Sequence, residues 1–224
     1  MPLPPAAIVF DLDGTLVDSL RDLAGTVSDL LAEHGRRPVG DDDVRRMVGD
    51  GLRILLGRAF SATGDPLSEA ALDALVPAFT ARYDTRSADH TRPYPGVAAT
   101  LAALRAAGHP LGIATNKPQA STERLLAAID LARFFDAVAG GDRYPFRKPD
   151  PRHPLAVLEA MGGRPDRALV VGDDPVDLAA GHAAGLPVAL ATWGYARRPY
   201  DTLDAEARLD RFDEIPALVS HLFP

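Results

Sequence analysis

Residues 6–19 read AAIVFDLDGTLVDS, in which a short apolar run ends in two aspartates, Asp11 and Asp13, with one leucine between them. Such a run, bounded by Asp and Gly, predicts a buried β-strand followed by a turn. Asp13 and Gly14 suit a turn without any further role. If the strand belongs to a parallel sheet, however, its carboxyl end is a ligand-binding position, and paired carboxylates there would hold a hard metal ion. The rest of the chain decides between these interpretations.

Four more apolar runs predict strands, and helical patterns lie between them. The runs occupy Leu111–Asn116, Ala137–Gly140, Leu169–Gly172 and Val188–Thr192. The intervening stretches have helical periodicity, and several end at a glycine. Alternation of this kind predicts an α/β fold, a Rossmann-like parallel sheet with helices on both faces.

One interval interrupts this alternation. From about Leu16 to Arg92 the sequence contains amphipathic helical patterns, at 27–35, 41–60 and 68–83, but no convincing strand. We therefore expect a helical cap at residues 16–92, inserted after the first strand and covering the strand ends. The sheet core then comprises residues 1–15 and 93–224.

Composition limits the classes of partner. The 224 residues include 24 basic and 31 acidic side chains, a formal net charge of −7, which argues against a general nucleic-acid binder. An anionic substrate would need a locally positive site. There is no cysteine, and the six histidines show no tight metal-ligand spacing. The apolar runs are too short to cross a bilayer and no signal peptide is evident, so no membrane partner and a cytoplasmic location are expected.

Polar loops follow four of the predicted strands. They are DLDGT (11–15), ATNK (114–117), RKPDP (147–151) and GDDPVD (172–177). Helix capping and solvated loop charges explain each of them singly. The chain has only two lysines, Lys117 and Lys148, against 22 arginines (24 basic residues less two), and both lysines lie in these loops. Because lysine is a compact point charge that fits a crowded anionic site, this bias favours a functional role.

The motifs VFDLDGTLVDS, RRMVGDG, RPYPGV, TNKP, GGDRYPFRKPDP and VGDDPVD follow one another along essentially the whole chain. In this order they resemble the haloacid-dehalogenase-type phosphohydrolases, and within them the bacterial phosphoglycolate phosphatases. The resemblance implies a phosphatase that uses Mg²⁺. Because the dehalogenase relatives lack a carboxylate at the position of Asp13, it also implies attack on phosphorus rather than on carbon.

The resemblance further implies different tasks for the two aspartates. Asp11 would be the nucleophile that forms an aspartyl-phosphate, and Asp13 the general acid and then the general base. Magnesium would be bound by the Asp11 carboxylate, the Asp13 backbone carbonyl and Asp173. Lys148 would offset the charge of Asp11 and of the phosphoryl group. The other implied phosphate or substrate contacts are Gly14, Thr115, Asn116 and Lys117.

Two positions after the fourth strand need separate treatment. Asp177 is expected to orient Lys148 or the waters of the metal rather than to bind the metal directly. Asp174 stands where family members often carry Ser or Thr, and whether it joins the metal shell stays open. The segment ARRPYD (196–201) also departs from the family pattern.

The cap is expected to select the substrate. Arg53 follows the glycine-flanked turn VGDG and is the best candidate to meet a substrate carboxylate, although it also suits a solvated helix face. The leading substrate is 2-phosphoglycolate. Alternatives are a sugar phosphate or pyrophosphate, a phosphomutase, which is less favoured because the cap lacks lysine, and a binding module without turnover. The sequence leaves open a monomer or a homodimer.

Overall fold

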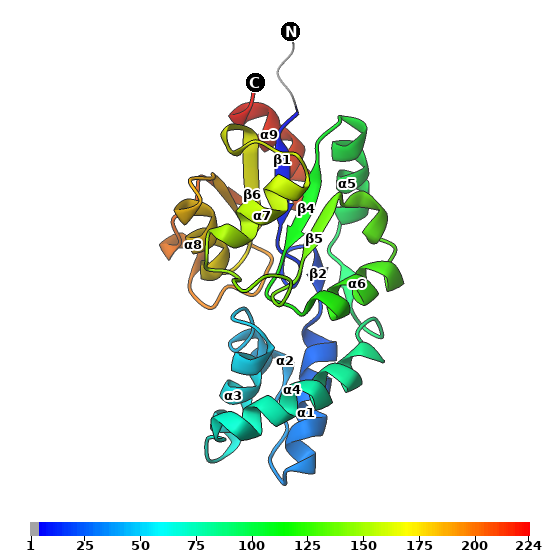
Figure 1. The fold of residues 1–224 in the computed structure, drawn as a ribbon, viewed down its shortest axis with the longest axis vertical. Helices are drawn as coiled ribbons and strands as arrows, with labels where there is room; N and C mark the ends of the chain where they lie inside the picture. The colour runs from blue at the N-terminus through cyan, green and yellow to red at the C-terminus, as the bar shows by residue number, and fades with distance from the viewer. Residues whose placement is uncertain (1–4) are drawn as a thin grey trace.

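The computed structural model describes residues 5–224, which form a sheet unit and a helical unit (Figure 1). The sheet has six parallel strands in the order β5–β4–β1–β6–β7–β8. The strands are β1 (Ala7–Phe10), β4 (Leu111–Ala114), β5 (Ala137–Ala139), β6 (Ala168–Gly172), β7 (Val188–Ala191) and β8 (Ala207–Leu209). The predicted α/β fold class is confirmed.

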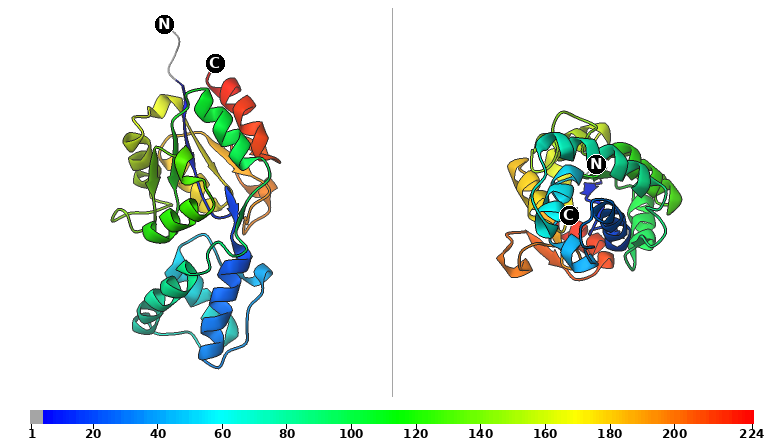
Figure 2. Two further views of the ribbon diagram at one scale, coloured as in Figure 1. Left: turned by 90° about the vertical axis from the view of Figure 1, so that its right-hand side faces the viewer. Right: turned by 90° about the horizontal axis from the view of Figure 1, so that it is seen from below.

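Helices cover both faces of the sheet (Figure 2). One face is packed by α5 (Val97–Ala106), α6 (Gln119–Ala128) and α9 (Ile215–Leu222), and the other by α7 (Arg152–Ala160) and α8 (Pro175–Ala183). Side chains of β1 alternate between these cores, since Ile8 and Phe10 belong to the first and Ala7 and Val9 to the second. Short 3₁₀ turns lie at Ala132–Phe134, Pro165–Arg167, Tyr200–Thr202 and Phe212–Glu214.

The strand order creates a crevice at the carboxyl end of β1. From β1 the chain continues to β4 and β5 on one side, and then returns to β6 on the other side of β1. The connections therefore diverge beside β1, which is where open α/β sheets bind their ligands. The DLDGT segment begins at this point, directly after Phe10.

The helical unit comprises α1 (Leu20–Glu33), α2 (Asp41–Arg45), α3 (Leu52–Thr63) and α4 (Glu69–Asp84). It has its own apolar core, which includes the fully buried Leu56 and Phe60. Two short antiparallel strands, β2 (Val17–Asp18) and β3 (Arg92–Pro93), join it to the sheet unit. Figure 1 shows the unit below the sheet, at the end opposite the C-terminus. The exact domain limits, 16–92 for the cap, remain a prediction, and residues 1–4 of the predicted core lie outside the described residues.

Three sequence predictions were wrong in detail. The edge strand β8 was not predicted, because its three residues include an arginine and only Leu209 is buried. β2 and β3 lie at the ends of the interval expected to contain no strand, and two residues each are too few for a periodic signal. The stretch 41–60 is two helices, since Gly49 and Gly51 adopt φ of +119° and +100° between α2 and α3, which a helix does not allow.

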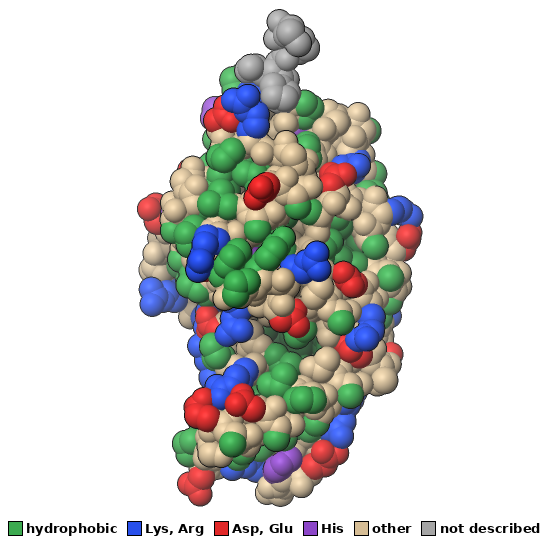
Figure 3. Space-filling model, viewed as in Figure 1, with side chains coloured by type: hydrophobic (Ala, Val, Ile, Leu, Met, Phe, Trp, Pro, Cys, Tyr) green, Lys and Arg blue, Asp and Glu red, His purple; other side chains and the backbone are tan. Residues whose placement is uncertain are grey.

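The length and polarity of the described helices decide whether any of them could span a membrane. Within residues 5–224 every helix is too short or too polar to cross a bilayer. Figure 3 shows basic and acidic side chains interspersed over the face that it presents, with hydrophobic side chains between them.

Candidate active site

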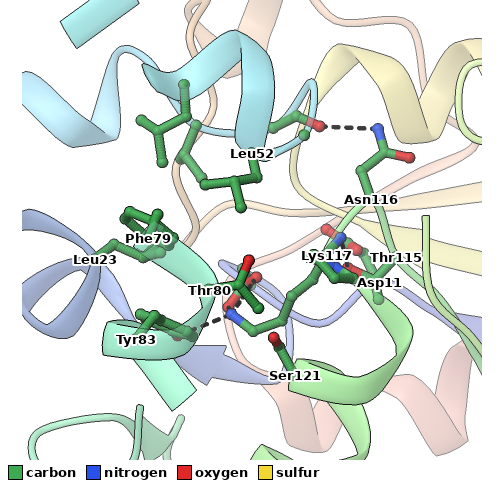
Figure 4. A pocket seen from close by; sticks show the side chains of 16 residues that line it. Asp11, Leu23, Leu52, Phe79, Thr80, Tyr83, Thr115, Asn116, Lys117 and Ser121 are labelled. Atoms are coloured by element: carbon green, nitrogen blue, oxygen red, sulfur yellow. Dashed lines mark hydrogen bonds and ion pairs between the residues drawn. The ribbon is translucent and has the colours of Figure 1, made fainter. Parts of the chain in front are cut away.

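A pocket lies between the carboxyl ends of the strands and the helical unit (Figure 4). The sheet unit contributes its polar wall, which contains Asp11, Asp13, Thr115, Asn116 and Lys117. The helical unit contributes a mainly apolar wall, which contains Leu23, Val48, Leu52, Leu55 and Phe79. The loops that follow β1 and β4 therefore meet here, as expected for parallel strands that share one edge.

Asp11 is paired with the buried Lys148. Lys148 Nζ lies 2.7 Å from Asp11 Oδ1 and 2.6 Å from Asp177 Oδ1. Burial raises the pKa of Asp11 to about 7, against the lowering effect of Lys148. Burial alone would lower the pKa of Lys148, but Asp11 and Asp177 reverse this and raise it, so the ammonium stays charged. Lys148 thus favours the ionised form of Asp11, the form that a nucleophile needs, against the effect of burial.

Asp173 lies buried at the end of β6 beside these carboxylates. Its Oδ1 accepts a hydrogen bond from the Thr15 hydroxyl at 2.6 Å, and its Oδ2 accepts one from the Tyr195 backbone N–H at 2.7 Å. Burial raises the pKa of Asp173 well above its ordinary value, and Asp11 and Asp177 raise it further. An ionised Asp173 therefore requires a positive charge nearby.

Three carboxylates form a cluster that fits a divalent cation. Asp11, Asp173 and Asp177 each offer an oxygen within 4.8 Å of the others. Lys148 supplies one positive charge against these three negative charges, so a hard ion with oxygen ligands would relieve the repulsion. Both oxygens of Asp177 are already used, Oδ1 by Lys148 and Oδ2 by the N–H groups of Asp173 and Asp174. Asp177 therefore positions Lys148 and the backbone of the loop after β6, which is what a supporting residue of the cluster does.

Asp13 has different partners from Asp11. Lys117 Nζ lies 3.1 Å from both of its carboxylate oxygens, and the Ser19 hydroxyl donates to its Oδ1 at 2.6 Å. The two aspartates are therefore served by separate lysines, although one leucine separates them in sequence. This separation suits two carboxylates with different tasks.

Thr115 and Asn116 line the pocket after β4, as predicted. The Thr115 hydroxyl accepts a hydrogen bond from the Lys117 N–H at 3.3 Å. The Asn116 side-chain amide donates to the carbonyl oxygen of Gly49 at 3.0 Å (Figure 4). It also donates to the carbonyl oxygen of Lys148 at 3.0 Å. Asn116 thereby connects the helical unit to the loop that carries Lys148.

Two predicted contact residues have other roles in the structure. The N–H of Gly14 donates to the Val17 carbonyl oxygen at 2.9 Å, so it is not free to bind phosphate. Gly14 has φ +92°, and a Cβ there would lie 2.3 Å from Asp173 Oδ2, which makes glycine necessary for the approach of Asp173. Arg53 does not line the pocket, because its guanidinium binds Asp73, at 2.6 Å, and Glu69 within the helical unit.

Asp174 is bound to an arginine instead of joining the carboxylate cluster. Arg197 Nη2 lies 2.7 Å from Asp174 Oδ1, and Nε lies 2.9 Å from Oδ2. The same guanidinium also pairs with Asp50 in the α2–α3 loop. Asp174 and the ARRPYD segment, the two departures from the family pattern, therefore contact each other through Arg197. Because Arg197 also binds Asp50, this interaction connects the helical unit to the loop after β6.

Several site residues escaped the sequence prediction. Thr15, Ser19, Tyr83 and Arg197 contact predicted site residues that lie 6 to 158 positions away in sequence, and Asp50 contacts Arg197. Tyr83 alone carried a signal, because it follows Phe79 by one helical turn on the buried face of α4. That pattern indicates burial and does not identify a hydrogen-bond partner.

His153 is expected to make the free energy of unfolding depend on pH. This side chain is buried at the start of α7, and burial together with Lys148 lowers its pKa from 6.5 to about 4. His153 of the unfolded chain therefore becomes protonated below about pH 6.5, whereas His153 of the folded chain becomes protonated only near pH 4. Stability due to neutral His153 is present above pH 6.5 and is lost as the pH falls toward 4.

We expect wild type to lose about 2 kcal/mol more than a His153→Phe variant between pH 7 and pH 5. Urea unfolding of both proteins at the two pH values measures this difference, and the subtraction removes the contributions of the shared carboxylates. Parallel pH profiles for the two proteins would contradict the assignment.

The geometry agrees with a known enzyme family. Residues 5–185 match the family model of haloacid dehalogenase-like hydrolases. The chain belongs to this family. In this chain Asp11, Lys148 and Asp173 come together at the carboxyl end of β1, and Asp13 lines the pocket beside them.

Individual relatives narrow the comparison. The chain is 43% identical over 211 residues to the phosphoglycolate phosphatase of Caulobacter vibrioides, covering 94% of this chain and 89% of that one. It is 40% identical over 222 residues to that of Agrobacterium fabrum, covering 99% and 95%. The crystal structure of a predicted phosphoglycolate phosphatase from Haemophilus somnus matches with a TM-score of 0.89 at 31% identity, covering 96% of this chain and 97% of that chain. This hydrolase is therefore a phosphoglycolate-phosphatase-like enzyme.

Proposed function

We propose that this enzyme hydrolyses small phosphate monoesters in a Mg²⁺-dependent reaction through an aspartyl-phosphate on Asp11, with 2-phosphoglycolate as the leading substrate. One observation carries the proposal: Asp11, at the pocket and paired with Lys148 at 2.7 Å, lies two residues from a second carboxylate that has separate partners. A nucleophile and a proton carrier side by side are what a covalent phosphatase needs.

In the first step an Asp11 carboxylate oxygen attacks phosphorus and the bond from phosphorus to the ester oxygen breaks. Asp13 gives its proton to that oxygen, so the alcohol leaves neutral. Lys148 stays beside Asp11 and counters the negative charge that gathers on the phosphoryl group. Thr115 and Asn116 would hold phosphoryl oxygens, and the support for this is that both line the same wall of the pocket.

In the second step water attacks the phosphorus of the aspartyl-phosphate. Asp13, now ionised, takes the proton of that water, and the bond from phosphorus to the Asp11 oxygen breaks. Inorganic phosphate leaves, and both aspartates return to their starting forms. The helical unit covers the pocket with apolar side chains, which limits access of water to the intermediate before the alcohol has left.

Magnesium would be held by the carboxylates of Asp11 and Asp173 and by the backbone carbonyl of Asp13. When bound, the ion supplies positive charge that lowers the repulsion between Asp11 and an anionic phosphate. The support for this is the donor set itself, since burial and mutual repulsion raise the pKa of Asp11 and Asp173 in the absence of a cation. Hard oxygen ligands favour Mg²⁺ over softer metals.

The substrate proposal rests on the pocket and on the relatives. Lys117 is the cation that lines the described pocket, and the wall opposite is mainly apolar, which suits a short anionic ester better than a polyhydroxylated sugar. The relatives that match over most of the chain are named phosphoglycolate phosphatases. We propose that residues 16–92 act as a cap that makes this selection.

Relative kcat/KM over a panel of phosphate esters tests the substrate. The panel contains 2-phosphoglycolate, a hexose phosphate, a pentose phosphate, pyrophosphate and p-nitrophenyl phosphate, each with saturating Mg²⁺. We expect phosphoglycolate to exceed the sugar phosphates by at least about tenfold, because they leave hydroxyl groups against an apolar wall. A higher value for a sugar phosphate would overturn the substrate assignment, and no turnover of any ester would overturn the reaction.

Metal removal is expected to silence the enzyme. EDTA should reduce turnover to background, and excess Mg²⁺ should restore it. The reason is that the positive charge of the metal ion keeps Asp11 and Asp173 ionised. Calcium should inhibit, because it takes more oxygen ligands than Mg²⁺ and competes for the Asp11 oxygen that attacks. Steady-state rates with each metal measure this, and magnesium-like rates with Ca²⁺ would refute the explanation.

A further inference from the structure

A tyrosine of the helical unit reaches the lysine that serves Asp13. Lys117 Nζ donates a hydrogen bond to the Tyr83 hydroxyl oxygen at 2.8 Å while it lies 3.1 Å from both oxygens of Asp13 (Figure 4). Tyr83 belongs to α4, whereas Lys117 follows β4 and Asp13 follows β1. The three residues line the same pocket and form one chain of contacts across the boundary between the two units.

The contact is buried and its charges are defined. Tyr83 is 2% exposed and Lys117 is 8% exposed, and the ammonium lies 4.4 Å from the centroid of the Tyr83 ring. Burial raises the pKa of Tyr83 to about 12, so the phenol is neutral. Burial would lower the pKa of Lys117, but Asp13 and Tyr83 reverse this and raise it. A neutral acceptor thus holds a charged ammonium beside the carboxyl group of Asp13.

Tyr83 is itself fixed by packing. Its ring stacks on Phe79 with centroids 5.6 Å apart, and both rings belong to the core of the helical unit. The position of the Tyr83 hydroxyl therefore follows the position of α4. If α4 moves away from the sheet unit, Lys117 loses this partner, while Asp13 keeps Ser19.

We propose that Tyr83 is a positioning residue for proton transfer, which acts through Lys117 on Asp13 and makes the acid step depend on the docking of α4. The inference rests on the proposed function of Asp13. When Asp13 gives its proton to the leaving oxygen, it becomes a carboxylate, and a fixed ammonium at its oxygens stabilises that new charge. Tyr83 keeps the ammonium in place, so the helical unit contributes to catalysis as well as to the pocket wall.

The test compares two leaving groups in a Tyr83→Phe variant. An alkyl ester such as 2-phosphoglycolate needs a proton on its leaving oxygen, whereas p-nitrophenyl phosphate needs very little. We expect kcat/KM to fall about tenfold for the alkyl ester and less than about twofold for p-nitrophenyl phosphate. Because kcat/KM covers only the events up to departure of the alcohol, the second step does not affect the comparison.

A double-mutant cycle tests whether Tyr83 acts through Lys117. Tyr83→Phe should cause the selective loss when it is made in the wild-type enzyme. It should cause no selective loss when it is made in a Lys117→Met enzyme, because the partner of the tyrosine is then missing. Thr26→Val is the matched control. It removes a buried hydroxyl whose hydrogen bond to the Asp22 carbonyl oxygen lies inside α1 of the same unit, outside the pocket lining, and it should change neither substrate.

The possible failures are distinguishable. Equal losses on both esters, or a selective loss of the same size with and without Lys117, would overturn the positioning role, and so would an unchanged Tyr83→Phe enzyme. A failure of the proposed function appears in wild type instead, as absent turnover of the alkyl ester. In that case the free energies of unfolding of the two single variants and the double variant still test the contact between Tyr83 and Lys117. Additive effects of Tyr83→Phe and Lys117→Met on this free energy would overturn the proposed contact between the two units.

Discussion

Replacing Asp11 by asparagine should lower kcat by at least about a thousandfold on every phosphate ester, while the protein stays folded. The amide has the shape of the carboxylate but is a far poorer nucleophile, so no aspartyl-phosphate forms. Lys148 keeps a partner at 2.6 Å, Asp177, and is not left unpaired. Removing one charge from the cluster Asp11, Asp173 and Asp177 also relieves repulsion, so the thermal midpoint without metal should be unchanged or higher.

Rapid-quench trapping of phosphorylated protein measures the missing intermediate directly, and thermal unfolding confirms the fold. Wild type should yield acid-stable, hydroxylamine-labile phosphoprotein, and Asp11→Asn should yield none. A variant that retains more than about a thousandth of wild-type kcat, verified by sequencing of the purified protein, would contradict the covalent role of Asp11.

Asp13→Asn should lower kcat/KM for 2-phosphoglycolate by about 10²- to 10⁴-fold, the usual contribution of a general acid. The asparagine keeps the position beside Ser19, but it carries no transferable proton. The loss should be much smaller for p-nitrophenyl phosphate, whose leaving group departs as an anion. Lys117 stays bound to the Tyr83 hydroxyl, so the charged side chain retains one of its partners.

Steady-state kinetics on both esters, with purified variant and saturating Mg²⁺, separates this role from a structural one. Because the second step also uses Asp13, kcat for p-nitrophenyl phosphate should fall even where kcat/KM is preserved, and a burst of nitrophenol should precede slow turnover. Equal losses of kcat/KM on both substrates, without a burst, would count against Asp13 as the proton donor.

The fold could be predicted well because its signals are local. β1, β4, β6 and β7 are continuous buried runs, and the polar loops after β1, β4, β5 and β6 belong to the site. Since parallel strands bring their carboxyl ends to one edge, linear order alone predicts that these loops meet. The strand β8 and the pair β2–β3 could not be predicted in this way, because two or three residues are too few to show a hydrophobic periodicity.

The candidate site could be predicted only for residues that the strand ends carry. Asp11, Asp13, Lys117, Lys148 and Asp173 lie in those loops, and the structure brings them together around one edge of the sheet. Arg53 was placed by a glycine-flanked turn, but side-chain direction on a helix depends on the neighbouring helix, and here α4 offers Glu69 and Asp73. The turn itself does reach the pocket, through Gly49 and Gly51.

The sequence by itself determined which residues have side chains suited to acid–base, nucleophilic and metal-binding roles. It also determined that these residues lie at the carboxyl ends of the parallel strands. Only the tertiary structure decided the pairings: Lys148 serves Asp11, Lys117 serves Asp13, and Arg197 occupies Asp174. It also decided that Tyr83 of the helical unit completes the surroundings of Lys117. The physical reason is distance, because charge pairing and hydrogen bonding act over about 3 Å, and such separations between remote segments exist only once the two units have packed.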